Sequence, residues 1–365
     1  MKGEFIMRKA PGRNLELIQM LKMIAPGTEL REGLDNILKA RTGALIVISD
    51  SKEVMDLADG GFKINEEYTP TKIYELAKMD GAIVLSGDGK RILLANTQLI
   101  PDPTIPTIET GTRHRSGERV AKQTNELVVS ISQRRNIITL FKGNLRYVIK
   151  DSSRVLASAN QAMQTLEKYK ASFDDIISAI NEFEFDDTVT LQNVVTAIQR
   201  AELCMKVVSE IESYVIELGD EGVLIDMQLK EFSSHIDVEE KLLIKDYLVN
   251  PLTTEDIIES ISNLSRKELL NTNQIAEILG YDTDKALDDV ELPSRGFRQL
   301  SKIPKLPANL IENMNLAIGD FQHIIMATID ELDDVEGIGE IRAKTIKQGI
   351  KRMHEQVIYD SKFYR

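Results

Sequence analysis

Residues 15–149 alternate between short apolar runs and amphipathic stretches, a pattern typical of an α/β domain. Several apolar runs contain no polar position, so the pattern predicts strands whose two faces are both covered by helices. The predicted strands span residues 44–48, 82–85, 92–95, 127–131, 137–141 and 145–149. The predicted helices span residues 15–24, 30–40, 71–78 and 117–124. Asp88-Gly89, between two of these strands, indicates a tight hairpin turn.

From residue 152 to residue 290 the strand pattern is absent, and apolar residues recur three and four positions apart, as in Val155, Ala159 and Met163. This spacing predicts an all-helical zone. The acidic segments 183–187 and 219–222 are interpreted as connections between helices. No group of titratable residues here resembles a reaction centre. We therefore interpret the zone as a spacer that sets geometry and packs subunits together.

A short internal repeat occupies residues 292–364, with its apolar positions offset by 32 residues. The matched pairs are Leu300 and Leu332, Ile303 and Val335, Leu306 and Ile338, Ile311 and Ala343, and Met314 and Ile346. The repeat predicts two equivalent helical units. The whole chain is thus predicted to be a multidomain α/β plus all-α protein, with domains over residues 1–150, 151–290 and 291–365.

Charge and composition narrow the classes of function. The 365 residues include 42% hydrophobic and 28% charged residues, which is the balance of a globular protein. A net charge of −13 argues against a surface that coats nucleic acid, so any DNA contact must be local. The one cysteine, Cys204, lies in a helical apolar pattern and is expected to be a buried thiol. Neither a secretory segment nor an apolar run of membrane-spanning length occurs, which favours a cytoplasmic protein.

The second unit of the repeat resembles a helix-hairpin-helix motif, in which Gly337-Ile-Gly339 precedes an amphipathic helix. Two glycines let the backbone turn tightly and approach a phosphate, while the next helix presents free N–H groups to it. The expected DNA-contacting residues are Gly337, Gly339, Arg342, Lys344 and Lys347. The first unit has Lys305 and Pro307 in place of the glycines, so it is expected to bind phosphate poorly. A purely structural pair of helices is the alternative reading of this zone.

Gly111-Thr-Arg-His-Arg115 is a compact basic cluster ahead of a helix that is expected to begin near Ser116. Two guanidinium groups, a hydroxyl and an imidazole beside a helix N-terminus suit a polyphosphate. Asp80 stands at the Gly-Ala turn into a predicted buried strand, where its carboxylate is expected to be fixed in place. A fixed carboxylate beside phosphates commonly holds a divalent metal or accepts a proton.

Together these segments resemble the diadenylate cyclase family, which joins two ATP molecules into cyclic di-AMP. Asp80-Gly-Ala82 resembles the acidic signature of that family, and Arg113-His-Arg115 resembles its basic signature. Residues 43–47, 60–62 and 109–112 are also similar to that domain. With a helical spacer and a C-terminal helix-hairpin-helix, the resemblance covers nearly the whole chain and points to the DNA-scanning members of the family.

The resemblance implies a role for each candidate residue. Asp80 would bind a metal, Mg²⁺ or Mn²⁺, and activate the 3′-hydroxyl of ATP. The implied catalytic residues are Asp80, Arg113, His114 and Arg115. The implied ATP-binding residues are Gly43, Gly81, Ala82, Leu99, Gly111, Thr112, Arg113 and Ser132. Gly81 is expected to permit close backbone approach to the nucleotide.

The resemblance also implies an assembly and partners. The product has two-fold symmetry, so two domains must face each other, and the family forms a homo-octamer. The implied partners are ATP and branched DNA of the Holliday-junction type, bound without sequence specificity, with a nucleoid location when DNA is bound. No membrane partner is expected.

The sequence also bears on four other classes of protein. The chain has no Gly-x-x-x-x-Gly-Lys-Ser/Thr run and no Gly-x-Gly-x-x-Gly after a strand, so neither a P-loop ATPase nor a dinucleotide-binding dehydrogenase is supported. A non-catalytic DNA-binding scaffold that only senses nucleotide remains an alternative. A base-excision glycosylase is disfavoured, because about 26 residues follow Gly339, too few for its usual helical domain.

Overall fold

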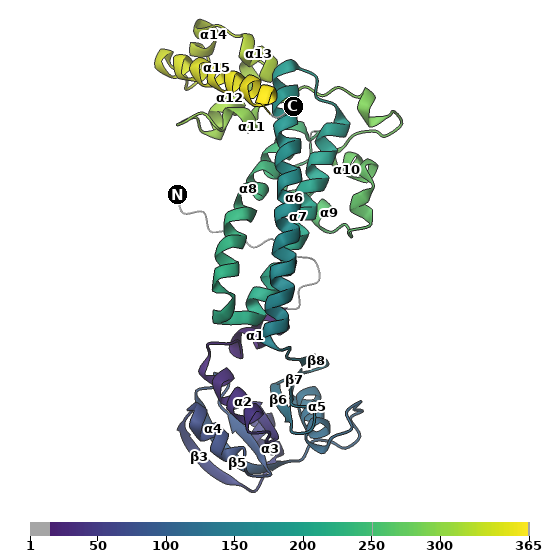
Figure 1. Ribbon diagram of the computed structural model, residues 1–365, viewed down its shortest axis with the longest axis vertical. Helices are drawn as coiled ribbons and strands as arrows, with labels where there is room; N and C mark the ends of the chain where they lie inside the picture. The colour runs from purple at the N-terminus through teal and green to yellow at the C-terminus, as the bar shows by residue number, and fades with distance from the viewer. Residues whose placement is uncertain (1–14, 250, 364–365) are drawn as a thin grey trace. The chain divides into compact units, whose positions relative to one another are not determined.

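The computed structural model describes residues 15–249 and 251–363 (Figure 1). Two compact units divide the chain. One is made of residues 13–159 with 213–225, and the other chiefly of residues 160–212 and 226–365. The predicted domain limits at residues 150 and 290 stay predictions. Among the described residues, no helix has both the length and the apolar character needed to cross a bilayer.

The N-terminal unit is built on a mixed sheet, and the described residues contribute eight strands to it. The strands are β1 (Ala44–Ile48), β2 (Ala58–Asp59), β3 (Phe62–Glu67), β4 (Ala82–Leu85), β5 (Arg91–Leu99), β6 (Leu127–Ser132), β7 (Ile137–Lys142) and β8 (Leu145–Val148). Their order is β2-β5-β4-β1-β6-β7-β8, with β3 also paired to β5. Only β1 and β4 run parallel, and the other pairs are antiparallel. All six predicted strands are confirmed, whereas β2 and β3 were not predicted.

Helices cover both faces of this sheet, as the uniformly apolar strands predicted (Figure 1). They are α1 (Leu15–Met23), α2 (Glu29–Lys39), α3 (Lys52–Leu57), α4 (Pro70–Leu76) and α5 (Thr112–Thr124). Side chains of β1 alternate between two cores: Ile46 packs with α1, α2 and α4, while Val47 packs with α3 and α5. The predicted turn at Asp88-Gly89 is confirmed, since Gly89 adopts a φ of +72° between β4 and β5.

The predicted start of the helix near Ser116 is wrong, because α5 begins four residues earlier, at Thr112. Gly111 is extended, with φ −80° and ψ 141°, and serves as the N-cap. The backbone N–H of Arg115 already donates to the carbonyl of Gly111, at 2.9 Å. The basic cluster is therefore the first turn of the helix and not a loop ahead of it.

The predicted all-helical zone is confirmed. Its main helices are α6 (Ser152–Asp186), α7 (Leu191–Leu218), α8 (Val223–Tyr247), α9 (Thr254–Ser262) and α10 (Thr272–Leu279). The connection predicted at 219–222 is a 3-10 turn, but α6 continues through most of 183–187 and ends at Asp186. Cys204 is buried in α7, as expected, and this burial raises the pKa of its thiol to about 12.

The C-terminal helices are α11 (Phe297–Leu300), α12 (Ala308–Ala317), α13 (Phe321–Met326), α14 (Ile329–Asp333) and α15 (Glu340–Phe363). The two predicted helical units are present as α11 with α12 and α14 with α15, and their matched apolar residues are all buried in one core. Lys305 and Gly337, 32 residues apart, both adopt left-handed backbone, with φ +62° and +84°. The two turns therefore share a backbone shape despite their different residues.

A buried polar network ties α11 to α6 and α8. The Arg298 guanidinium lies 2.6 Å from a carboxylate oxygen of Glu184 and 3.5 Å from one of Glu239. The Asp246 carboxylate accepts the backbone N–H groups of Phe297 and Arg298, at 2.6 and 2.9 Å. These bonds satisfy the N-terminus of a very short helix and hold it against two long ones.

Candidate functional site

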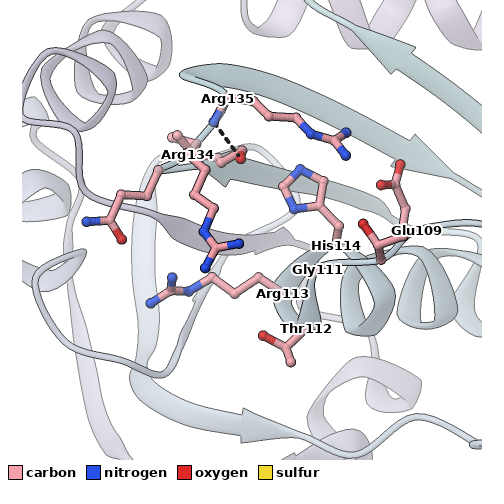
Figure 2. A pocket seen from close by; sticks show the side chains of 11 residues that line it. Glu109, Gly111, Thr112, Arg113, His114, Arg134 and Arg135 are labelled. Carbon is pink, nitrogen blue, oxygen red and sulfur yellow. Dashed lines mark hydrogen bonds between the residues drawn. The ribbon is translucent and has the colours of Figure 1, made fainter.

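A cavity of about 570 Å³ opens where the N-terminus of α5 meets the turn between β6 and β7 (Figure 2). Residues 109–114 and 131–135 line it. The turn contributes Arg134 and Arg135, and the helix contributes Arg113, so three guanidinium groups surround one space. Because guanidinium groups bind phosphate oxygens with paired hydrogen bonds, the cavity suits a polyphosphate.

The first turn of α5 leaves its backbone N–H groups open to the cavity. Gly111 makes no side-chain cap, whereas Thr28, Ser51 and Thr69 cap α2, α3 and α4 of the same unit. The helix dipole adds positive potential at this end, to the positive charge of Arg113. Helix and arginines thus favour an anion at the same place.

Arg113 links the cavity to Asp80. Its Nη2 atom lies 3.5 Å from Oδ1 of Asp80, which precedes β4. Gly43 makes room for this arginine, because a Cβ atom there would lie 2.7 Å from Nη1 of Arg113. The Asp80 side chain is otherwise fully exposed, so the expectation that it is fixed in place is wrong for the single chain. Arg113 and Asp80 therefore lie together, whereas Arg115, the second arginine of the basic cluster, lies outside the cavity lining.

His114 enters the cavity as a neutral ring. It is buried, its Nδ1 atom lies 3.0 Å from the Ser130 hydroxyl, and its ring meets Phe141 edge-on. Burial lowers the pKa of His114 below its ordinary value, so it carries no charge at neutral pH. Its Nε2 atom is buried without a hydrogen-bond partner among the described residues. His114 is therefore suited to a hydrogen bond with a ligand and not to charge neutralisation.

The segment before α5 is held by buried carboxylates. Glu118 accepts the hydroxyl of Thr107 and the backbone N–H of Ile108, and pairs with Lys122 at 2.7 Å. Glu109 lines the cavity but is neutralised by Arg146 of β8, at 2.7 Å. These contacts fix the loop that delivers Gly111 to the helix start.

The structure brings some of the sequence-predicted residues together and leaves others outside the cavity. Gly111, Thr112, Arg113, His114 and Ser132 line it. Arg115 is exposed and lies outside the lining, and Ala82 and Leu99 are buried in β4 and β5. Gly81 approaches the backbone of Asn96 closely, since a Cβ atom on it would lie 2.4 Å from the Asn96 carbonyl carbon. The close approach at Gly81 is thus to a strand of the same chain. Contact of Gly81 with a nucleotide stays a prediction.

Sequence reasoning missed Arg134, Arg135 and Glu109 as cavity residues. Two consecutive arginines in the short connection between two predicted strands were a usable signal. Such a turn projects from the end of the sheet at which the strands meet the basic helix start. Glu109 lies in a segment that resembles the diadenylate cyclase domain, but its pairing with Arg146, 37 residues away in sequence, gave no signal.

The candidate metal ligand stands alone. Among the residues that the structure describes, no three His, Cys, Asp or Glu side chains gather as a metal site. Asp80 nonetheless fits a Mg²⁺ or Mn²⁺ ion, because such ions commonly take one or two carboxylates together with substrate phosphates. The exposed carboxylate beside a cavity suited to phosphates matches that donor set.

The candidate DNA-contacting residues lie at the second C-terminal turn and on α15. Arg342 donates to the carbonyl of Gly337, and Lys344 pairs with Glu340 at 2.5 Å. Lys347 donates to the carbonyl of Ile325 in α13, at 2.7 Å, so it partly serves the fold. The backbone around Gly337 and Gly339 and the exposed Arg342 and Lys344 are the groups best placed for a phosphate.

Comparisons with known proteins point to the same family over successive parts of the chain. The model of the DisA bacterial checkpoint controller nucleotide-binding family matches residues 31–145, and that of the DisA linker region matches residues 149–287. DNA integrity scanning protein DisA of Clostridium botulinum (strain Loch Maree / Type A3) is 54% identical over 95% of this chain and 98% of its own. Its counterpart in Clostridium tetani is 52% identical over 94% of this chain and 96% of its own. A solved chain of DacA from Staphylococcus aureus is 21% identical over 37% of this chain and 87% of its own, with a TM-score of 0.28.

Two family models and relatives of more than 50% identity cover the cavity, the long helices and the C-terminal turns. The chain therefore belongs to the DisA family of DNA integrity scanning proteins.

Proposed function

We propose that this protein condenses two ATP molecules into cyclic di-3′,5′-AMP and releases two pyrophosphates. The observation that carries the proposal is the cavity of Arg113, Arg134 and Arg135 at an uncapped helix start, joined to Asp80 through Arg113. The arginines suit the β- and γ-phosphates, which depart as pyrophosphate. The aspartate suits the hydroxyl that attacks.

In each half-reaction, the 3′-hydroxyl of one ATP attacks the α-phosphorus of the other. A P–O bond forms between the 3′-oxygen and the α-phosphorus, the bond from the α-phosphorus to the oxygen that bridges to the β-phosphate breaks, and the hydroxyl proton passes to the Asp80 carboxylate. Asp80 is positioned to assist that proton transfer, while the arginines and the first amides of α5 stabilise charge on the leaving pyrophosphate. A Mg²⁺ or Mn²⁺ ion held by Asp80 and phosphate oxygens would supply further charge neutralisation.

The exposure of Asp80 supports a reaction between two subunits. Within the described part of a single chain, its carboxylate has one contact, at 3.5 Å to Arg113. The two-fold symmetric product requires two sites to face each other, and a facing subunit would enclose this carboxylate. We therefore propose that the active form is a homo-oligomer, with the family's octamer as the expected state.

The cyclase proposal is tested with the purified full chain, ATP, and MgCl₂ or MnCl₂, with products identified by mass spectrometry. Asp80→Asn should abolish cyclic di-AMP while preserving the fold. Asp56→Asn is the matched control, because Asp56 is an exposed aspartate of α3 outside the cavity. If the unaltered chain binds ATP but makes no cyclic product with either metal, it is a nucleotide-sensing scaffold instead.

We propose, second, that the α14–α15 turn is a helix-hairpin-helix that binds branched DNA without reading its sequence. The left-handed Gly337, the absence of a side chain at Gly339 and the positive charge of Arg342 and Lys344 support this. Binding of a Holliday junction and of a linear duplex should be compared by fluorescence anisotropy at fixed salt. Equal cyclase rates with and without the junction would separate DNA binding from control of catalysis.

A further inference from the structure

A second and larger cavity, of about 920 Å³, lies within the N-terminal unit beside the catalytic one. Its walls come from α2, from the start of β7 and the end of β8, and from residues 152–158 and Tyr214 of the long helices α6 and α7. The volume falls in the range of small-molecule and cofactor sites, about 300–1,000 Å³. Neither the family descriptions nor the proposed reaction assigns a ligand to this cavity.

The lining combines positively charged and apolar side chains. Four basic side chains and two acidic ones contribute to it, together with apolar residues such as Leu38, Ile138 and Val155. Both acidic groups are already engaged: Asp35 pairs with Arg31 at 2.9 Å, and Asp151 accepts the backbone N–H of Ser153 at 3.0 Å.

Two of the four cations remain available. Lys39 and Arg154 are exposed, and neither side chain forms an ion pair with any residue that the structure describes. Two available cations and apolar side chains in one lining suit an amphipathic anion, whose phosphate meets the cations and whose aromatic ring meets the apolar side chains. A nucleoside monophosphate has this chemistry.

The second cavity borders a turn that also lines the catalytic cavity. The turn between β6 and β7 is shared, because Gln133, Arg134 and Arg135 line the catalytic cavity and Asn136 lines the second one. Asn136 adopts a left-handed φ of +53°, and its N–H donates to the carbonyl of Ser132 at 2.9 Å. A ligand against Asn136 therefore acts on the turn that carries two arginines of the catalytic cavity.

We infer that this second cavity is a regulatory site for a nucleoside monophosphate. The phosphate is held by Lys39 and Arg154, and occupancy restrains the β6–β7 turn and so changes catalysis by Arg134 and Arg135. The regulatory effect rests on the proposed cyclase function, whereas binding at the site does not.

Hydrogen exchange of the full-length protein tests binding, with AMP as the probe and the catalytic cavity first saturated with a non-hydrolysable ATP analogue. AMP should slow exchange at residues 136–138 and 148–155 at least about two-fold. Lys39→Ala with Arg154→Ala should abolish that protection. Lys52→Ala with Lys90→Ala is the control, because both lysines are exposed and line neither cavity.

Cyclase assays at saturating ATP test the regulatory step. AMP should change kcat, an effect that competition for the ATP site cannot produce, and the Lys39/Arg154 double variant should lose the response. Unchanged exchange at 136–138 and 148–155, or equal protection in the double variant, would overturn the inference. If cyclic di-AMP still forms without AMP in that case, the proposed function stands and only the regulatory site fails.

Discussion

Arg298 and Glu184 form an ion pair of 2.6 Å in which neither side chain has any exposed surface. The pair joins α11, where the C-terminal turns begin, to the end of α6. Gln299 donates to the same Glu184 oxygen at 2.7 Å, and Tyr247 donates to the other at 2.8 Å. Both charges are buried and have lost their hydration, so each depends on the charge of its partner to offset the cost of desolvation.

Arg298→Met should destabilise the protein by on the order of 3–5 kcal/mol, because it leaves the buried Glu184 carboxylate without a compensating positive charge. The measurement is the free energy of unfolding in urea. Arg266→Met is the control: its pair with Glu210 is 2.7 Å long, but the side chains are 61% and 43% exposed. That change should cost only about 0–1 kcal/mol. Equal losses in the two variants would show that burial does not set the strength of the Arg298 pair.

Stability should fall as the pH rises from about 4 to about 7, through the titration of Asp246. Burial, with a contribution from Glu184, raises the pKa of Asp246 from 3.8 to about 7 in the folded protein. The folded state therefore binds a proton that the unfolded state has released, and this stabilisation is lost as the pH passes the folded pKa.

The check is the urea midpoint at pH 5 and at pH 8 for the parent protein and for Asp246→Asn. The parent midpoint should drop between the two values, and the variant should show a smaller drop. A parent midpoint that stays constant or rises would contradict the assignment to Asp246.

Gly43→Ala should impair catalysis while leaving the fold intact. The new Cβ atom would lie 2.7 Å from Nη1 of Arg113, and the end of a flexible side chain yields before the backbone does. Displacement of this guanidinium should lower kcat/KM for ATP by about 10–100-fold. In Gly87→Ala, the matched control, the Cβ atom meets only Asp50, at 3.3 Å. Similar kinetics in both variants would remove Arg113 from the proposed machinery.

Lys305→Gly with Pro307→Gly should strengthen binding to junction DNA. Lys305 already holds the left-handed backbone that Gly337 holds in the second turn, so glycine fits there without rearrangement. Replacing Pro307 restores an N–H group that can donate to a phosphate, worth about tenfold in affinity. Fluorescence anisotropy at fixed salt measures the change.

Gly337→Ala is the opposing variant for this experiment. It places a Cβ atom at a φ of +84° and 2.7 Å from Cδ2 of Leu310, so it should weaken DNA binding. A gain from the double glycine variant that persists when Gly337 is also changed would show that the first turn contacts DNA by itself.

Strands made wholly of apolar residues were predictable, because burial on both faces leaves an uninterrupted run such as 44–48. β3 escaped prediction because its sequence, Phe62–Glu67, is mostly polar and exposed, and Asn65 interrupts it with a φ of +51°. The repeat was predictable down to its paired turns, since buried positions recur at a fixed offset. The left-handed backbone conformation of Lys305 was visible only in the structure.

The site was predictable where its residues are close in sequence and hidden where they are not. Gly111 to Arg115 form one segment, so their joint chemistry could be inferred without a fold. The start of α5 was placed too late because arginine and histidine at a first turn carry no strong capping signal. The Arg298 network draws its carboxylates from residues more than 50 positions away, and no local pattern announces it.

If the proposed reaction holds, the missing cap on α5 makes the ATP substrate part of the structure of that helix. Serine or threonine side chains cap α2, α3 and α4, but the first turn of α5, from Thr112, has no side-chain cap and can take an external acceptor. A triphosphate would finish that helix, so occupancy and order of the turn rise together. In the proposed reaction, the departure of pyrophosphate would leave the turn uncapped again, so the step that completes the chemistry would also weaken binding of the remaining product.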